Sequence, residues 1–363
     1  MTPKLVLHVG PGKCGSSSIQ NFFATQEFPC TESIRYKLLN PAVIAELNRQ
    51  DADKSLLDEV QQQLSVDLRG CDCLILSHEV MLRNTQAAYN YCLLAKNITN
   101  NITIIGYCRK QSGFIKSAYS QWLFRSPERI REVNAIINRL KFDPNLFTGI
   151  ERQLMASIEN NFYSARQLSG FNMLDWLSAY NNMAQLTRTL GVTLSIGTLP
   201  EKESNPSLIQ DFCGRANLTL HSDIKDAHRE KVNLSLDHSL VEAINTAICV
   251  GIDMMGPHER NDIISLLSSL MKTKVNLNGF LNELAAYTDW YYWTSNIMFC
   301  KQYGIDKEYF KPGPEIGKQE ILYSMACENH KRSVNRSVVI ERHQLLTASI
   351  IELCINLAKR GQV

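Results

Sequence analysis

A glycine-rich loop near the start of the chain carries the residues best suited to bind an anion. Residues 5–9 form an apolar run, Gly10 and Gly15 enclose a short loop, and Lys13 lies inside it. Glycine leaves backbone N–H groups accessible, and the first N–H groups of a following helix have no partner within that helix. The helix dipole and the Lys13 ammonium add positive charge. The sequence therefore predicts a phosphate-binding loop between a strand and a helix.

This loop departs from the order of residues found in nucleoside triphosphatases. There, a lysine follows the second glycine directly, and the next hydroxyl holds magnesium. Gly10 and Gly15 keep the spacing, but Ser16 follows Gly15 and the lysine stands at position 13. A tight turn before a capped helix would give the same glycines without any ligand. The pattern favours an anion site without fixing the reaction.

Two further apolar runs end in polar side chains. Arg109 follows residues 101–108, and Ser117 lies eight positions later. Arg offers a planar fork of donors to a phosphate, and Ser adds one more. Taken singly, the arginine could form a surface ion pair and the serine could be an ordinary helix hydroxyl. Their order after the first loop favours a shared anionic ligand.

The other run, residues 71–77, is followed by His78 and Glu79. Transfer of a group to an alcohol needs a base for the hydroxyl proton, and we expect Glu79 in this role with His78 as second candidate. Neighbouring strand residues point to opposite faces, so only one of the two is expected to enter the cleft. The other would be a packed or solvent-facing side chain.

Together these elements resemble the sulfotransferases that use 3′-phosphoadenosine 5′-phosphosulfate. Serines stand where that family commonly has threonines, which keeps the hydroxyl donors. The resemblance implies that Arg109 and Ser117 bind the 3′-phosphate and that Glu79 matches a carboxylate common in bacterial and glycan-directed members. The residues that it assigns to the 5′-phosphosulfate-binding loop are Gly12, Lys13, Cys14, Gly15, Ser16, Ser17 and Ser18.

The resemblance implies in-line transfer of a sulfuryl group from this donor to a hydroxyl, expected to belong to a carbohydrate. Lys13 would neutralise charge on the transferred group and the leaving phosphate, a role that metal ions fill in phosphoryl transfer, so no metal is expected. Residues 229–235 resemble a basic-x-Asn-x-Ser segment of bacterial members. We expect either that Lys231 or Arg229 contacts the nucleotide phosphate or that both are solvated charges.

Two other functions fit parts of the sequence. A divergent P-loop kinase would use ATP and magnesium, but the displaced lysine and the lack of a clear acidic strand for magnesium count against it. A non-catalytic relative could bind a nucleotide or a glycan without chemistry. The serines in place of threonines and the Pro11-Gly12 pair keep this last reading open.

Composition limits the function only a little. The 363 residues are 44% hydrophobic and 20% charged with a net charge of +2, which does not mark a nucleic-acid binder. We expect no secretory signal and no membrane-spanning segment, which would need an apolar run of roughly eighteen residues. Eleven cysteines without C-x-x-C pairs predict reduced thiols in a cytoplasmic protein. Cys14 is either a thiol activated by the helix end and Lys13 or a small space-filling side chain.

Alternating strands and helices predict an α/β fold, a parallel sheet flanked by helices of the P-loop-like sulfotransferase type, with a mostly helical C-terminal part. We expect a nucleotide-binding core over residues 1–240 and a helical extension over 241–363. The expected strands are 4–9, 71–77, 101–108 and 192–196. One expected helix begins at residue 16. The others cover residues 54–67, 111–124, 175–190, 239–250, 262–271 and 342–358.

Residues 126–172 are expected to be irregular and to contribute to acceptor binding, because Pro127, Pro144 and Gly149 interrupt them. Basic residues of this segment could line a trench for an anionic saccharide or form a solvated helix face. They are Arg129, Arg131, Arg139 and Lys141. The aromatic residues 291–293 could stack on a sugar or pack in a core.

Overall fold

The computed structural model describes residues 2–24, 32–119, 127–162, 174–200, 206–220 and 278–335. The chain forms two compact units, each assembled from three segments. The sheet unit comprises Met1–Lys110, Ser169–Asn233 and Thr294–Phe310. The helical unit comprises Gln111–Leu168, Leu234–Trp293 and Lys311–Val363. The boundary expected near residue 240 lies outside the described residues, so that division stays a prediction.

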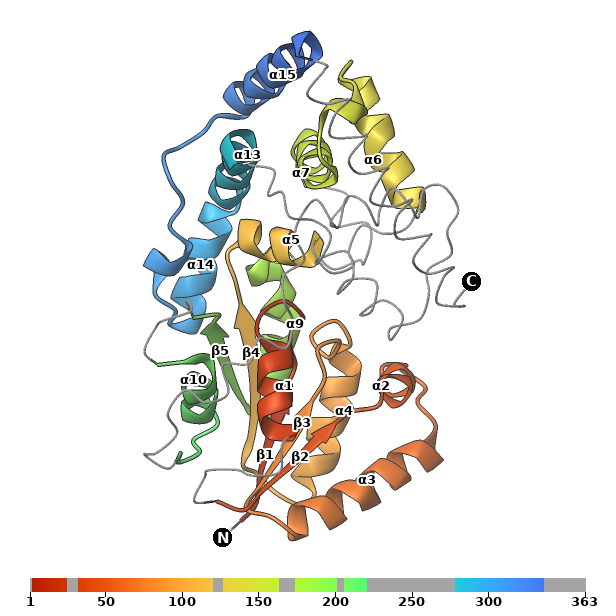
Figure 1. Ribbon diagram of the computed structural model, residues 1–363. Helices are drawn as coiled ribbons and strands as arrows, with labels where there is room; N and C mark the ends of the chain where they lie inside the picture. The colour runs from red at the N-terminus through yellow and green to blue at the C-terminus, as the bar shows by residue number, and fades with distance from the viewer. Residues whose placement is uncertain are drawn as a thin grey trace, which may run out of the picture. The chain divides into compact units, whose positions relative to one another are not determined.

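Five parallel strands form the core of the sheet unit, in the order β2-β3-β1-β4-β5 (Figure 1). Their bounds are β1 Lys4–His8, β2 Ile34–Leu38, β3 Cys73–Ser77, β4 Ile102–Cys108 and β5 Thr193–Thr198. Helices pack on both faces of the central strands, which explains why β1, β3 and β4 are continuous apolar runs. Leu5, Val6 and Leu7 of β1 are all 0% exposed. The expected α/β fold with a parallel sheet and flanking helices is confirmed.

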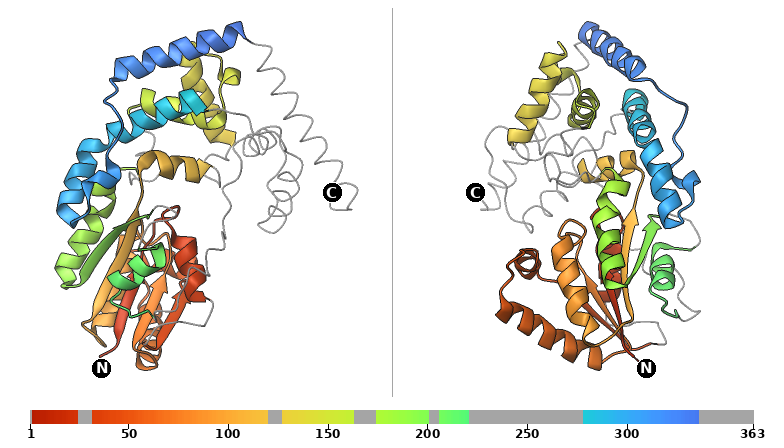
Figure 2. Two further views of the ribbon diagram at one scale, coloured as in Figure 1. Left: turned by 60° about the vertical axis from the view of Figure 1, so that its left-hand side comes forward. Right: turned by 180° about the vertical axis from the view of Figure 1, so that it is seen from behind.

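Helices cover both faces of this sheet. On one face α1 (Ser16–Ala24) contacts α10 (Leu208–Arg215). The other face carries α3 (Lys54–Arg69), α4 (Thr85–Lys96) and α9 (Trp176–Leu190), with α2 (Pro41–Leu47) against α4, as the view from behind shows (Figure 2). The connection after β1 runs toward β2, whereas the connections after β3 and β4 run toward β5. Because such crossovers are right-handed, helices that follow the two directions lie on opposite faces of the sheet.

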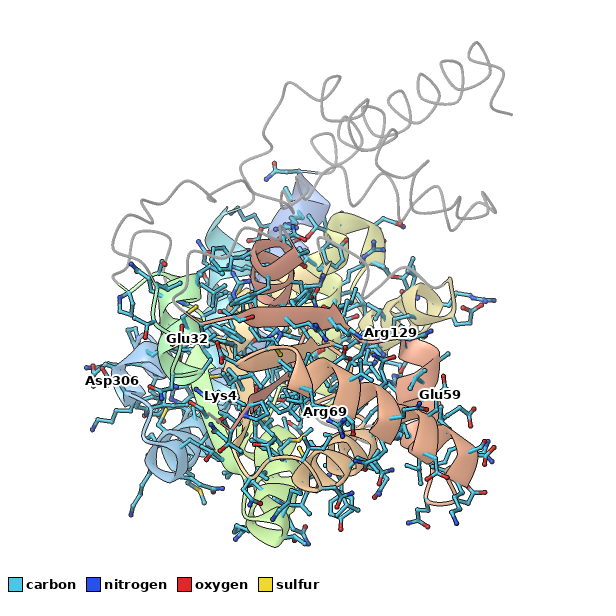
Figure 3. The ribbon with its side chains drawn as sticks, turned by 90° about the horizontal axis from the view of Figure 1, so that it is seen from below. Lys4, Glu32, Glu59, Arg69, Arg129 and Asp306 are labelled. Carbon is cyan, nitrogen blue, oxygen red and sulfur yellow. The ribbon has the colours of Figure 1, made fainter. Side chains whose placement is uncertain are left out.

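Two backbone carbonyls hold the side chain of Lys4 at the amino end of β1. Figure 3 looks at this edge from below, where Lys4 begins β1. Its Nζ donates to the carbonyls of Ala216 at 2.8 Å and Asn217 at 3.0 Å. These two hydrogen bonds give Lys4 a structural role at the start of the sheet.

The sequence pattern does not predict β2, because this edge strand alternates apolar and basic residues. Arg35 and Lys37 both form ion pairs with Asp67 of α3, at 3.1 and 2.6 Å. The Asp67 side chain is only 5% exposed. Tertiary ion pairs of this kind, together with pairing to β3, hold a strand that has no apolar run of its own.

The helical unit contains α5 (Gln111–Tyr119), α6 (Pro127–Arg139), α7 (Gly149–Glu159), α13 (Asn278–Tyr291), α15 (Lys318–Val334) and the 3₁₀ turn η1 (Pro144–Leu146). The expectation of an irregular segment over 126–172 is wrong for its described part. The two prolines and Gly149 stand at the starts of α6, η1 and α7, where proline in particular is well tolerated. They therefore mark the beginnings of elements.

A buried ion pair links two helices of the helical unit. The Glu151 side chain is 0% exposed and accepts hydrogen bonds of 2.9 Å from Nη1 and Nη2 of Arg332 on α15. Thr148 caps α7, and its backbone N–H donates to the same carboxylate at 2.8 Å. The Arg332 guanidinium also lies over the rings of Phe147 and Phe280. This cluster joins α7, α15 and the start of α13.

Two of the basic residues of α6 form ion pairs along their own helix. Arg129 is 7% exposed and pairs with Glu132 at 2.6 Å, and Arg131 pairs with Glu128 at 3.1 Å. Arg131 is exposed, as expected for a solvated helix face, whereas Arg129 is buried and fits neither alternative. Tyr292 is buried and contacts Phe162, whereas Tyr291 is 39% exposed. Tyr292 is thus a core residue.

The C-terminal part is mostly helical over the described residues 278–335, as expected. After α13 the chain continues into α14 (Trp293–Tyr303) and η2 (Lys307–Phe310), which belong to the sheet unit from Thr294 onward. The expected helices 239–250, 262–271 and 342–358 lie outside the described residues. Within the ranges that the structure describes, no helix is both long and apolar enough to cross a membrane.

Candidate functional site

The carboxyl ends of β3, β1 and β4 are neighbours and carry three of the predicted elements. β1 leads into the glycine-rich loop (residues 10–15), β3 into His78 and Glu79, and β4 into Arg109. The chain leaves β1 toward β2 but leaves β4 toward β5, so its direction reverses between these adjacent strands (Figure 1). Open parallel sheets bind ligands at such a reversal. The predicted elements thus meet where the topology favours a ligand.

Left-handed backbone conformations shape the glycine-rich loop. The φ angles of Gly10, Lys13 and Gly15 are 84°, 69° and 92°. A Cβ on Gly10 would lie 2.7 Å from the Cα and carbonyl oxygen of Glu79, so only glycine fits there. The Gly10 carbonyl accepts from the Tyr107 N–H at 3.1 Å, which joins the loop to β4.

The serines after the loop form the first turn of α1. Ser16 is buried, and its Oγ donates to the Pro11 carbonyl at 2.9 Å. This hydrogen bond joins the two ends of the loop, and the Ser16 hydroxyl proton is used in it. Ser17 is half-buried and Ser18 is exposed. These two side chains lie at the start of the helix, where the helix dipole favours an anion.

Cys14 is fully buried within the loop. Burial raises the pKa of its thiol, and the charge of Arg109 lowers it by less. The idea that the helix end and Lys13 activate this thiol is therefore wrong. Cys14 fills space, and any contact with a ligand would come from its backbone.

Glu79 lies against the glycine-rich loop. A Cβ on Gly12 would lie 2.7 Å from Oε2 of Glu79 and 3.2 Å from its Cδ. Gly12 directly precedes Lys13, and its lack of a side chain makes room for the Glu79 carboxylate. Of the two candidate bases, the structure brings Glu79 to the loop.

His78 takes part in the turn after β3. Its Nδ1 accepts from the Val80 N–H at 3.2 Å, and its backbone N–H donates to the His8 carbonyl at 3.1 Å. Partial burial lowers the pKa of His78, while the charge of Glu79 raises it by less. A ring with one nitrogen engaged in the turn fits a structural residue.

Arg109 is held at the loop from two sides. Its Nη1 donates to the Lys13 carbonyl at 3.4 Å, and its own carbonyl accepts from Nε1 of Trp176 at 2.7 Å. Ser117 is half-buried on α5 in the helical unit, so its pairing with Arg109 stays a prediction. Lys231 lies outside the described residues.

Sequence reasoning missed a polar contact beneath the loop. His8 is 0% exposed, and its Nδ1 shares a hydrogen bond of 2.8 Å with Oγ of Ser77. Nε2 of Gln20 on α1 donates to the same hydroxyl at 3.3 Å. Burial lowers the pKa of His8 to about 3, so its ring is neutral. The signal in the sequence was a polar residue at the end of each of two apolar runs.

Among the described residues, no group of three or more His, Cys, Asp or Glu side chains is arranged to hold a metal ion. Independence from metal stays a prediction. Comparisons of the chain with protein-family models, with curated proteins and with solved structures found no match.

Proposed function

We propose that the chain transfers a sulfuryl group from 3′-phosphoadenosine 5′-phosphosulfate to a hydroxyl of a carbohydrate. The observation that carries this proposal is the convergence of Glu79 and Arg109 on one glycine-rich loop. The carboxylate lies against Gly12, and the guanidinium donates to the Lys13 carbonyl. In-line transfer from an anionic donor needs an anion-binding loop, a fixed cation and a base close together.

In this reaction the acceptor oxygen attacks the sulfur atom, and the bond from sulfur to the 5′-phosphate oxygen breaks. The Glu79 carboxylate takes the proton of the acceptor hydroxyl. Lys13 and the N–H groups at the start of α1 stabilise negative charge on the leaving phosphate. Arg109 holds the 3′-phosphate, and adenosine 3′,5′-bisphosphate is released.

The choice of a carbohydrate acceptor depends on Glu79 and on the resemblance. Sulfotransferases that act on glycans often have a carboxylate at the place where enzymes for small molecules have histidine. His78 and Glu79 are adjacent in this chain, but Glu79 is the one against Gly12. A saccharide hydroxyl is therefore the acceptor to test first.

One observation also favours the kinase alternative. The Glu79 carboxylate follows the strand next to β1, where it could hold magnesium on a nucleoside triphosphate. Lysine at position 13 does not fit the usual triphosphate loop. A kinase would need ATP and magnesium for binding and turnover, and a non-catalytic relative would bind a nucleotide or glycan without turnover.

The test of the proposed reaction is transfer of label from ³⁵S-labelled donor to a panel of poly- and oligosaccharides. We expect wild type to transfer label, and Glu79→Gln to bind the donor but to lose about two to four orders of magnitude in turnover, the range for a general base. His78→Gln is the matched control and should retain activity. Full activity of Glu79→Gln, or no transfer by folded wild type that binds ATP with magnesium instead, would overturn the proposal.

A further inference from the structure

One face of α9 holds the carbonyl groups at the end of β4. Trp176 Nε1 donates to the Arg109 carbonyl at 2.7 Å, and the Tyr180 hydroxyl donates to the Tyr107 carbonyl at 2.8 Å. The Tyr180 hydroxyl also lies 3.4 Å from the Gly10 carbonyl. Trp176 is 1% exposed and Tyr180 is 0% exposed. Residues four apart share one face of a helix, so both rings act from the same side.

The helix that carries these rings is fixed at both ends. Asp175 caps α9 by accepting from the Ser178 N–H, and it also accepts from the hydroxyl of Ser295 on α14. Gly191 ends the helix in the left-handed conformation. Gly106 leaves room for the Tyr180 hydroxyl, which a side chain at that position would strike. The two donors therefore approach β4 from a fixed support.

We infer that Trp176 is a positioning residue for Arg109 and thereby sets the preference of the site for a nucleotide that carries a 3′-phosphate. This inference rests on the proposed function, in which Arg109 binds that phosphate. Arg109 lies one residue beyond the end of β4, and its long bond of 3.4 Å to the Lys13 carbonyl is a weak restraint on the side chain. The short indole bond at its carbonyl fixes the backbone from which the guanidinium extends.

Tyr180 supports a different part of the site. Its hydroxyl contacts the Tyr107 and Gly10 carbonyls, which belong to β4 and to the loop for the 5′-phosphate. Loss of this hydroxyl should change the affinity for every 5′-phosphorylated nucleotide by the same factor. Loss of the indole N–H should change only the part of the affinity that comes from the 3′-phosphate. The two aromatic residues thus provide matched variants.

The experiment measures binding of adenosine 3′,5′-bisphosphate and adenosine 5′-monophosphate by calorimetry, with wild type, Trp176→Phe and Tyr180→Phe. The quantity of interest is the ratio of the two dissociation constants. Wild type should prefer the bisphosphate, Trp176→Phe should reduce that ratio about tenfold, and Tyr180→Phe should leave it unchanged, because one buried hydrogen bond is removed in each variant. Affinity for the monophosphate should be unchanged in Trp176→Phe.

A ratio in Trp176→Phe equal to that of wild type would overturn the inference while leaving the proposed function standing. A wild type without preference for the bisphosphate would instead contradict the proposed function itself. If Trp176→Phe fails to fold, the indole N–H signal of Trp176 in ¹⁵N-labelled wild type replaces it. The four tryptophans are distinguished by substituting Trp122, Trp290 and Trp293. This signal should shift with the bisphosphate and not with the monophosphate, and equal shifts would overturn the inference.

Discussion

At the scale of single residues, two glycines of the loop make room for different parts of one residue. The backbone of Glu79 lies against Gly10, and its carboxylate lies against Gly12. Gly10 also has a φ of 84°, which L side chains rarely adopt, whereas Gly12 has no such requirement. The two positions should therefore respond differently to the same small substitution.

Gly12→Ala is expected to fold with little loss of stability, because the atom in its way is the far end of the Glu79 side chain, 2.7 Å from the new Cβ. The carboxylate must move, so sulfuryl transfer should fall at least tenfold. Gly10→Ala should instead cost about 1–2 kcal/mol or more in free energy of unfolding, since a left-handed alanine also meets backbone atoms. Urea unfolding and the label-transfer assay check both variants. Unchanged activity of Gly12→Ala would contradict the placement of Glu79 as the base.

His8 should make the stability of the protein depend on pH. Unfolded His8 gains a proton below about pH 6.5, whereas the folded ring, with its pKa lowered to about 3, stays neutral. Because the unfolded state binds more protons in this window, the free energy of unfolding falls as the pH falls from 6.5 toward 3. Between pH 7 and pH 5 the loss from this one group is about 2 kcal/mol.

The check is urea unfolding at pH 7 and pH 5 of wild type, His8→Gln and the control His78→Gln. His8→Gln should show the smaller difference in stability between the two pH values, and His78→Gln should behave more like wild type, because His78 is only half-buried. An identical pH dependence in wild type and His8→Gln would refute the assignment.

The order of residues predicted that Glu79, Lys13 and Arg109 lie near one another, because each comes shortly after an apolar run and the carboxyl ends of parallel strands lie at the same end of a sheet. The same reasoning could not find Trp176 or Tyr180. Their donors reach backbone carbonyls 67 and 73 residues away in sequence, and no local pattern encodes such a contact. For Cys14 the sequence left two interpretations open, and its complete burial agrees with the space-filling one.

At the scale of elements, four of the five strands were predicted, and three of them are buried on both faces, whereas β5 is an edge strand. β1, β3 and β4 need continuous apolar runs, and that requirement is visible in the sequence. β2 was missed because Arg35 and Lys37 obtain their partner from α3. α6 and α7 were missed because a proline or a glycine near a helix start reads as an interruption until the helix itself is known.

The buried ion pair of the helical unit should be important for its stability. Arg332→Ala would leave the Glu151 carboxylate, 0% exposed, without its guanidinium, and removal of one partner of such a pair costs about 3–5 kcal/mol. Arg131→Ala on α6 is the matched control, because the side chains of Arg131 and Glu128 are 74% and 73% exposed. Its effect should be within measurement error, since exposed pairs contribute little. Thermal unfolding of both variants tests this prediction. Equally small losses of stability in the two variants would contradict the importance of the buried pair.

At the scale of the whole molecule, the chain passes five times between the two units. The sheet unit alone carries the glycine-rich loop, Glu79 and Arg109, whereas Ser117 belongs to the helical unit. The sequence predicted a helical C-terminal part but not that residues 294–310 return to the sheet unit, because such a return depends on tertiary contacts such as that of Phe299 with Tyr180.

The most direct test of the proposed donor is calorimetric binding of adenosine 3′,5′-bisphosphate beside ATP with magnesium, with wild type and Arg109→Ala. The account predicts that wild type prefers the bisphosphate and that EDTA leaves this binding unchanged. It also predicts that Arg109→Ala weakens binding about tenfold or more, as expected for loss of a charged hydrogen bond. Binding of ATP with magnesium in preference to the bisphosphate, or bisphosphate binding that is indifferent to Arg109, would contradict it.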